Sequence, residues 1–110
     1  MYTGSTVPFV NPTQRALHFL GHGHEFGAAD EFEYERMADA FMSDPLQGDL
    51  LECTNPTGDH DRIRLHAITL HFGVAYNVTI VRTYHIRNAL GVARKGGPLG
   101  FITAKCAEVH

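Results

Sequence analysis

Four consecutive residues, Arg82, Thr83, Tyr84 and His85, offer a guanidinium, a hydroxyl, a phenol and an imidazole within one short stretch of the chain. A second imidazole, His22, lies between two glycines in the N-terminal part. Two imidazoles can exchange protons with a substrate near neutral pH, and an arginine binds phosphate through two parallel hydrogen bonds. The set predicts RNA cleavage without a metal ion. His22 would act as general acid or base, and His85 or Tyr84 would transfer the second proton. Arg82 and Thr83 would hold the scissile phosphate.

The strand around these residues sets a condition on such a site. Side chains alternate between the two faces of a strand, so Thr83 and His85 are expected on one face together with Val81. The other face carries Arg82 and Tyr84. Arg82 and His85 can therefore serve one site only where the strand is twisted or bulged. An isolated histidine or arginine on a strand is more often a surface or hydrogen-bonding group. The site shared by Arg82 and His85 is therefore a hypothesis that requires such a twist or bulge.

The composition indicates one globular domain over residues 1–110. Hydrophobic residues make up 44% of the chain and charged residues 19%, and no apolar run approaches the roughly 20 residues of a membrane span. A net charge of −3 argues against a broad surface that coats nucleic acid, but it allows a local pocket for one phosphate. Eight histidines make any histidine-based activity dependent on pH between about 5 and 8. Cys53 and Cys106 are too few for a disulfide framework, and we expect buried free thiols, with a single bridge as the alternative.

A zinc site is the main competing hypothesis for the histidines. His22 and His24 lie about 200° apart on a helix and cannot share one ion. The spacing of His60, Asp61 and His66 matches no specific metal-binding pattern. The chain contains neither a His-Glu-x-x-His motif nor a phosphate-loop or dinucleotide fingerprint, and we expect no metal and no cofactor.

Two helices are expected before the first strand. Asn11 and Pro12 form a strong helix start, and an apolar stripe continues from there to Gly27, which supplies the stop. Asp30 opens the second helix with Glu33 three residues on, in the manner of a capping box. The inner face of this second helix is expected to carry Tyr34, Met37, Ala38 and Phe41.

Beyond residue 48 the hydrophobic period changes from helical to alternating, which predicts β-strands. We expect strands at 50–54, 62–68, 70–75, 78–86 and 101–107. Short connections favour an antiparallel sheet, which gives an α+β domain with two N-terminal helices packed on a four- to five-stranded antiparallel sheet. Residues 1–10 are expected to form a loose lead-in. Residues 87–100 are expected to form a long loop, rich in glycine and basic residues, that is disordered without ligand or contacts phosphate.

Several short motifs follow one another in an order that is typical of a known protein family. An aromatic residue and a histidine lead into a Gly-x-Glu-Phe-Gly run, then into aromatic and small residues of the second helix, and later into Phe-x-Val and Val-Arg-Thr-aromatic strands. The residues concerned are Phe19, His22, Gly23, Glu25, Phe26, Gly27, Tyr34, Ala38, Phe41, Phe72, Val74, Val81, Arg82, Thr83 and Tyr84. This order resembles the nuclease domains at the C-terminal tips of bacterial polymorphic toxins, in the barnase/EndoU/colicin/RelE-like ribonuclease group.

The resemblance implies a helix-then-sheet ribonuclease toxin with His22, Arg82 and Thr83 as catalytic groups. It implies RNA, including tRNA, as substrate and a cognate immunity protein as partner, with no DNA and no membrane partner. Such a toxin would act in the bacterial cytoplasm after delivery from another cell as part of a larger secreted protein.

The chain departs from the family pattern at Gly21, where a lysine is expected. Arg15, Arg64 or Lys105 would then bind the phosphate in its place. Two other function classes stay open from the sequence. One is a non-catalytic, histidine-rich protein-binding module, and the other is a toxin of different chemistry, such as ADP-ribosyl transfer.

Overall fold

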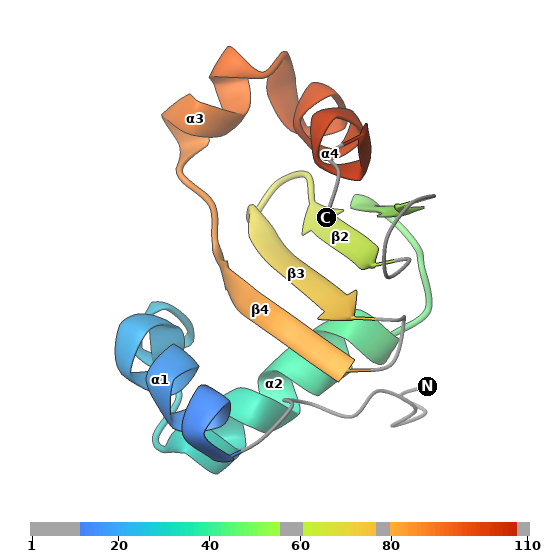
Figure 1. Cartoon of the computed structure of the whole chain (residues 1–110). Helices are drawn as coiled ribbons and strands as arrows, with labels where there is room; N and C mark the ends of the chain where they lie inside the picture. Colours follow the sequence, from blue (N-terminus) through green and yellow to red (C-terminus); the bar gives the residue numbers. More distant parts are fainter. Residues whose placement is uncertain (1–11, 56–60, 77–79, 108–110) are drawn as a thin grey trace.

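The computed structural model describes residues 12–55, 61–76 and 80–107, and for Tyr76, Ile80 and Arg82 it describes the backbone alone. The expected lead-in at 1–10 lies outside these ranges. In chain order the described elements are α1 (Pro12–His22), the 3-10 helix η1 (Gly23–Phe26), α2 (Glu31–Ser43), β1 (Leu50–Thr54), β2 (Arg62–His66), β3 (His71–Tyr76), β4 (Ile80–Ile86), α3 (Ala89–Arg94) and α4 (Gly97–Ala107) (Figure 1). The strands form one antiparallel sheet in the order β1-β2-β3-β4, which confirms the α+β prediction.

The sheet carries helices on both faces (Figure 1). α2 packs against β3 and β4, and α1 lies beside the edge strand β4. α4 covers β1 and β2 from the opposite side. None of the described helices is long and apolar enough to cross a membrane.

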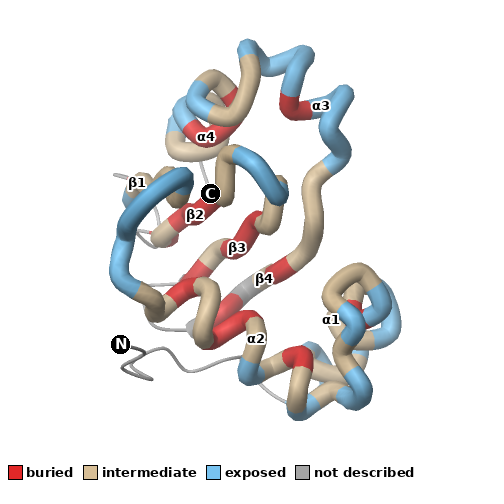
Figure 2. Tube along the Cα trace, turned by 180° about the vertical axis from the view of Figure 1, so that it is seen from behind, coloured by how far each residue is buried: buried red, intermediate tan, exposed pale blue. Residues whose placement is uncertain are grey.

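Each face of the sheet has its own hydrophobic core, and the buried positions follow the strands between the helical layers (Figure 2). The core under α2 consists of Tyr34, Ala38, Met42, Ala75, Val81 and Tyr84. The core under α4 consists of Ile63, Leu65, Phe72, Val92, Phe101 and Ile102. Burial of apolar area on this scale is the main favourable contribution to folding.

The two N-terminal helices arise from local signals in the sequence. The Asp30 side chain accepts a hydrogen bond from the Glu33 amide at 2.8 Å, so the predicted start of α2 is confirmed. The first helix was expected to continue to Gly27, but α1 ends at His22 and the chain tightens into η1. Gly27 then adopts a left-handed φ of 68°, which glycine reaches at low cost, and so it does supply the predicted stop.

The C-terminal segment corrects the sequence prediction. Residues 101–107, expected as a fifth strand, belong to helix α4, and 87–100 contains α3 and the start of α4 instead of a long loop. Asn88 caps α3 by accepting a hydrogen bond from the Gly91 amide at 3.0 Å. Phe101, Ile102 and Cys106 all pack against the sheet, and their spacing is helical. In so short an apolar segment this spacing also fits the alternation of a strand.

The pairing of β3 with β4 contains a register shift at Arg82. Thr83 pairs with Val74, and Val81 pairs with Ala75, so Arg82 is the extra residue of a β-bulge. This is the irregularity that a shared site of Arg82 and His85 requires. It also corrects the expected alternation, because Val81 is buried in the same core as Tyr84 instead of sharing a face with Thr83.

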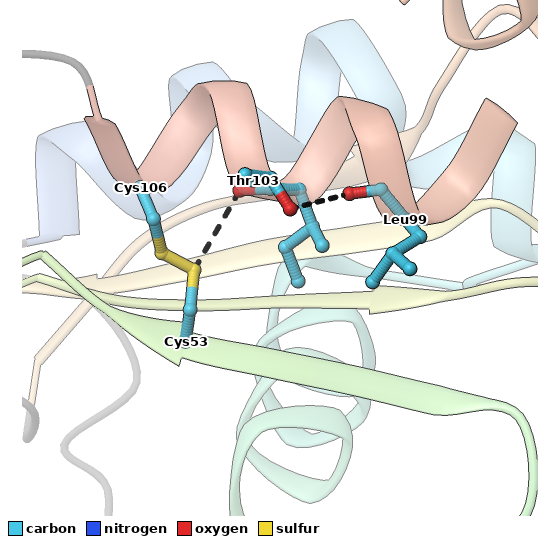
Figure 3. Close-up of a disulfide and its surroundings, with 5 residues drawn as sticks. Cys53, Leu99, Thr103 and Cys106 are labelled. Atoms are coloured by element: carbon cyan, nitrogen blue, oxygen red, sulfur yellow. Dashed lines mark hydrogen bonds between the residues drawn. A yellow bond between two sulfur atoms is a disulfide. The ribbon is translucent and has the colours of Figure 1, made fainter. Parts of the chain in front are cut away.

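Cys53 and Cys106 form a disulfide between β1 and the last turn of α4, so the expectation of free thiols was wrong (Figure 3). Their Cα atoms lie 6.3 Å apart, although 53 residues separate them in sequence. In the same helix, the Thr103 hydroxyl donates a hydrogen bond to the Leu99 carbonyl at 2.8 Å (Figure 3). Because residues 101–107 belong to α4 and α4 packs on β1, Cys106 faces the strand that carries Cys53.

Two glycines next to His22 differ sharply in what they allow. A Cβ atom on Gly23 would lie 2.6 Å from Phe19 Cε1, whereas one on Gly21 would meet nothing within 4 Å. We expect Gly23→Ala to lower the free energy of unfolding by about 1–3 kcal/mol through overpacking. Gly21→Ala should leave it unchanged or raise it by up to about 1 kcal/mol. Urea unfolding of both variants measures this, and equal effects would contradict the packing of Phe19 on Gly23.

Candidate active site

The turn between α1 and η1 joins His22 to Glu25. His22 Nδ1 lies 2.7 Å from Glu25 Oε2, a contact that the three-residue spacing permits in a tightly wound turn. The other carboxylate oxygen, Oε1, accepts a hydrogen bond from the backbone amide of Ile86 at 2.7 Å. Glu25 therefore fixes the orientation of the His22 ring and holds this turn against the edge strand β4.

His85 meets His22 at this edge. The two rings are stacked, with centroids 4.9 Å apart and planes 27° from parallel. His85 pairs with Phe72 across the sheet, and their ring centroids lie 5.4 Å apart in an edge-to-face arrangement. His18, one turn before His22, adds a third imidazole at 6.5 Å from the His22 ring. Both His22 and His85 are half-buried and so remain accessible to a ligand.

The surroundings of His85 favour its neutral form. Burial lowers the pKa of His85, and the nearby positive charges of His22 and Arg87 lower it further. The Ile86 backbone and Glu25 oppose this effect without reversing it. A neutral imidazole at pH 7 can accept a proton, which is what a general base must do.

Glu25 keeps its charge next to the two imidazoles. Partial burial alone would raise the pKa of Glu25. The hydrogen bonds from His22 and from the Ile86 amide, together with the positive charges of His22 and His85, outweigh burial, and the net effect is a lowered pKa. Burial, with a smaller contribution from His22, lowers the pKa of His18. The site therefore pairs an ionised carboxylate with His22 and a neutral imidazole at His85.

This geometry assigns different nitrogens to different tasks. Glu25 engages Nδ1 of His22, which leaves Nε2 for a ligand. A protonated His22 can donate from Nε2 while Glu25 stabilises the imidazolium, in the way a carboxylate supports a catalytic histidine. His85 and His22 can thus serve as a base and an acid at one site.

The structure places the other predicted catalytic groups differently. Thr83 is half-buried and lies two residues before His85 on the same strand, beyond the bulge. Arg82 occupies the bulge itself, and its side chain lies outside the described part of the chain. Tyr84 is 4% exposed and stacks on Phe26 with centroids 4.0 Å apart, in the core under α2. Burial raises the pKa of Tyr84 and keeps its phenol away from solvent, so Tyr84 lies outside the candidate site.

Two of the three expected phosphate-binding cations have structural roles instead. The Arg15 guanidinium contacts Glu31 at 2.9 Å and Glu35 at 3.5 Å, which ties α1 to α2. Arg64 is 3% exposed and contacts Glu52 at 2.9 Å. Arg64 also donates to the carbonyl oxygens of Phe41 and Asp44 at 2.8 and 2.7 Å, and so it holds the end of α2 on the sheet.

The third expected cation, Lys105, lines a pocket between α3 and α4 together with three other basic side chains. Lys105 therefore stays a candidate for phosphate binding, at a position separate from the two imidazoles.

The other described histidines, His24, His66 and His71, have surroundings of their own. His24 is exposed beside His22, and His66 Nδ1 accepts hydrogen bonds from the Ile68 and Thr69 amides at 3.1 Å. His71 packs edge-on against Phe26. Within residues 12–55, 61–76 and 80–107, no three His, Cys, Asp or Glu side chains are arranged to hold a metal ion.

Glu25 belongs to the candidate site by its contacts, and the sequence-based site omitted it. Its position three residues after His22, in a segment broken by glycines, was the available signal. Its bond to the Ile86 amide depends on the tertiary fold and could not be read from spacing. The chain matches no known protein family, no curated protein and no solved structure, so the assignment of the site depends on this geometry.

Proposed function

We propose that the protein is a metal-independent ribonuclease that cleaves RNA by attack of a ribose 2′-hydroxyl on the adjacent phosphate. The observation that carries the proposal is the stacked pair of His22 and His85, with Glu25 bound to the first ring. Such a reaction needs one group that accepts a proton and one that donates a proton near neutral pH. The differing surroundings of the two imidazoles suit this division.

In the proposed reaction His85 removes the proton from the 2′-hydroxyl as the O2′–P bond forms. His22 donates its Nε2 proton to the 5′-oxygen as the P–O5′ bond breaks, and the product carries a 2′,3′-cyclic phosphate. Glu25 stabilises the imidazolium of His22 before the transfer. Thr83 and Arg82 are proposed to hold the non-bridging phosphate oxygens, on which negative charge grows in the transition state.

We further propose that the activity is that of a toxin, on the strength of the resemblance to the barnase/EndoU/colicin/RelE-like group. The natural substrate would be RNA, including tRNA, in the bacterial cytoplasm. A cognate immunity protein would neutralise the enzyme by covering the edge of β4 where the two imidazoles meet.

The first test is incubation of the purified protein with total RNA and with tRNA in excess EDTA. We expect fragments that end in 2′,3′-cyclic phosphate, and a single 2′-deoxynucleotide at a mapped cleavage position should block cleavage there. A folded protein that cleaves no RNA under these conditions or with added divalent metal would refute the proposal. That outcome would favour a protein-binding module.

The pH dependence should report the environment of His85. Because its pKa is lowered, kcat/KM is expected to rise with pH on the acidic side with a midpoint below 6.5, the ordinary value for histidine. The positive charge of Arg87 contributes to that lowering, so Arg87→Gln should move the midpoint to higher pH. Arg36→Gln, on the exposed side of α2, is the matched control. A midpoint that does not move, or moves down, in Arg87→Gln would contradict the role of His85 as base.

A further inference from the structure

A pocket of about 270 Å³ lies between α3 and α4, close to where β4 leaves the sheet. Four basic side chains line it, namely Arg87, Arg94, Lys95 and Lys105. No acidic residue is among the described residues that line it. A concave site of this size takes a single phosphate and sugar more readily than the flat surface of a protein partner.

The pocket concentrates positive charge in a chain that is acidic overall. Its four basic residues are close to half of the nine Lys and Arg residues, while the net charge is −3. Residues 62–107 contain seven Lys and Arg and no Asp or Glu. Clustered cations in a cleft raise the local concentration of an anionic ligand and speed its binding.

Most other described arginines are already bound to carboxylates. Arg15, Arg62 and Arg64 form ion pairs with glutamates of α2 and β1. Arg87 and Arg94, by contrast, form no ion pair with any residue that the structure describes. The guanidinium groups of the pocket therefore keep their hydrogen-bonding capacity for an external anion.

Arg87 connects the pocket to the imidazole pair. Its guanidinium carbon lies 4.9 Å from the centroid of the Phe101 ring and 5.3 Å from that of Phe72. Phe72 in turn contacts His85 edge-to-face. The two rings thus hold Arg87 between the pocket and His85, on the face of the sheet that α4 covers.

From this arrangement we propose that the α3–α4 pocket binds a backbone phosphate of the RNA strand, next to the phosphate that is cleaved. The inference builds on the proposed function and adds a second phosphate subsite to it. An RNA strand with its scissile phosphate at His22 and His85 would extend from the edge of β4 toward α3 and place a neighbouring phosphate between Arg87, Arg94 and Lys95. Arginine suits this task because its planar fork matches phosphate geometry.

The test measures binding of an eight-nucleotide 2′-O-methyl RNA, which lacks the attacking hydroxyl and so cannot be cleaved. Fluorescence anisotropy compares the wild type, the double variant Arg94→Gln/Lys95→Gln and the control Arg36→Gln across a series of salt concentrations. We expect the double variant to bind about tenfold or more weakly, with a salt slope reduced by roughly one. Arg36→Gln should match the wild type, and circular dichroism checks that all three are folded.

Equal affinity and salt slope in the double variant and the wild type would overturn the proposal. A second outcome would also overturn the proposal: polyglutamate competes with the octamer at equal potency, and its binding to the protein is lost in the double variant. That result would indicate an acidic protein partner. Cleavage is assayed separately on ordinary RNA. Octamer binding lost in the double variant, with no RNA cleavage by the wild type, would support the pocket and refute the ribonuclease. RNA cleavage by the wild type, with octamer binding unchanged in the double variant, would support the ribonuclease and refute the phosphate subsite in the pocket.

Discussion

Replacing His85 with alanine is expected to slow RNA cleavage by about 10²- to 10⁴-fold, the usual contribution of a general acid or base. His22→Ala should cost about as much, because the geometry assigns the two imidazoles to the two halves of one proton exchange. The loss should fall mainly on kcat, since these groups act on the transition state more than on substrate binding. Single-turnover cleavage of a short RNA by each variant measures the effect.

The matched control for both substitutions is His24→Ala. His24 is exposed and lies only two residues from His22, so its replacement changes the histidine content and the local charge without touching the pair. The double variant His22→Ala/His85→Ala should lose less than the product of the two single losses, because residues that act as a unit are not additive. A His24→Ala variant as impaired as His22→Ala, or full activity in either site variant, would contradict the assignment.

Removing the disulfide is expected to lower the free energy of unfolding by about 4 kcal/mol, the chain-entropy value for a cross-link that spans 53 residues. The bridge ties α4 to β1, and α4 supplies Phe101 and Ile102 to one of the two cores. The measurement is urea unfolding of the wild type and of Cys53→Ser/Cys106→Ser, each with and without reductant.

Reductant should destabilise the wild type to the level of the double serine variant and leave that variant unaffected. A wild type that is indifferent to reductant, and as stable as the variant, would contradict the bridge. For the proposed toxin the bridge would stabilise the domain outside the cell, where disulfides persist. We expect it to be reduced in a bacterial cytoplasm, with a matching fall in stability.

The fold was predictable from the sequence where local chemistry decides the structure. The Asp30 cap, the stop at Gly27 and the strand at Leu50–Thr54 all follow from signals within a few residues. The α4 helix was missed because a seven-residue apolar segment fits strand and helix equally well, and packing on β1 and β2 selects the helix. The disulfide was expected only as the alternative to free thiols, because the short segment does not reveal that Cys106 lies on a helix packed against β1.

The candidate site was predictable in part. His22 and His85 were both selected by residue type, and the structure brings their rings together. Long-range partners were beyond the reach of spacing. Arg64 looked like a free cation because nothing local reveals its contacts with Glu52 and the end of α2. Tyr84 looked reactive because one strand does not reveal which of its faces α2 will bury.

A modified RNA substrate distinguishes the proposed roles of His85 as the base and His22 as the acid of one ribonuclease site. An RNA with sulfur in place of the bridging 5′-oxygen at the cleaved position has a leaving group that departs without protonation, since a thiol is far more acidic than an alcohol. We predict that this substrate restores most of the activity lost in His22→Ala and little of that lost in His85→Ala. Equal losses on both substrates for both variants, or rescue of His85→Ala alone, would refute these roles of the two imidazoles.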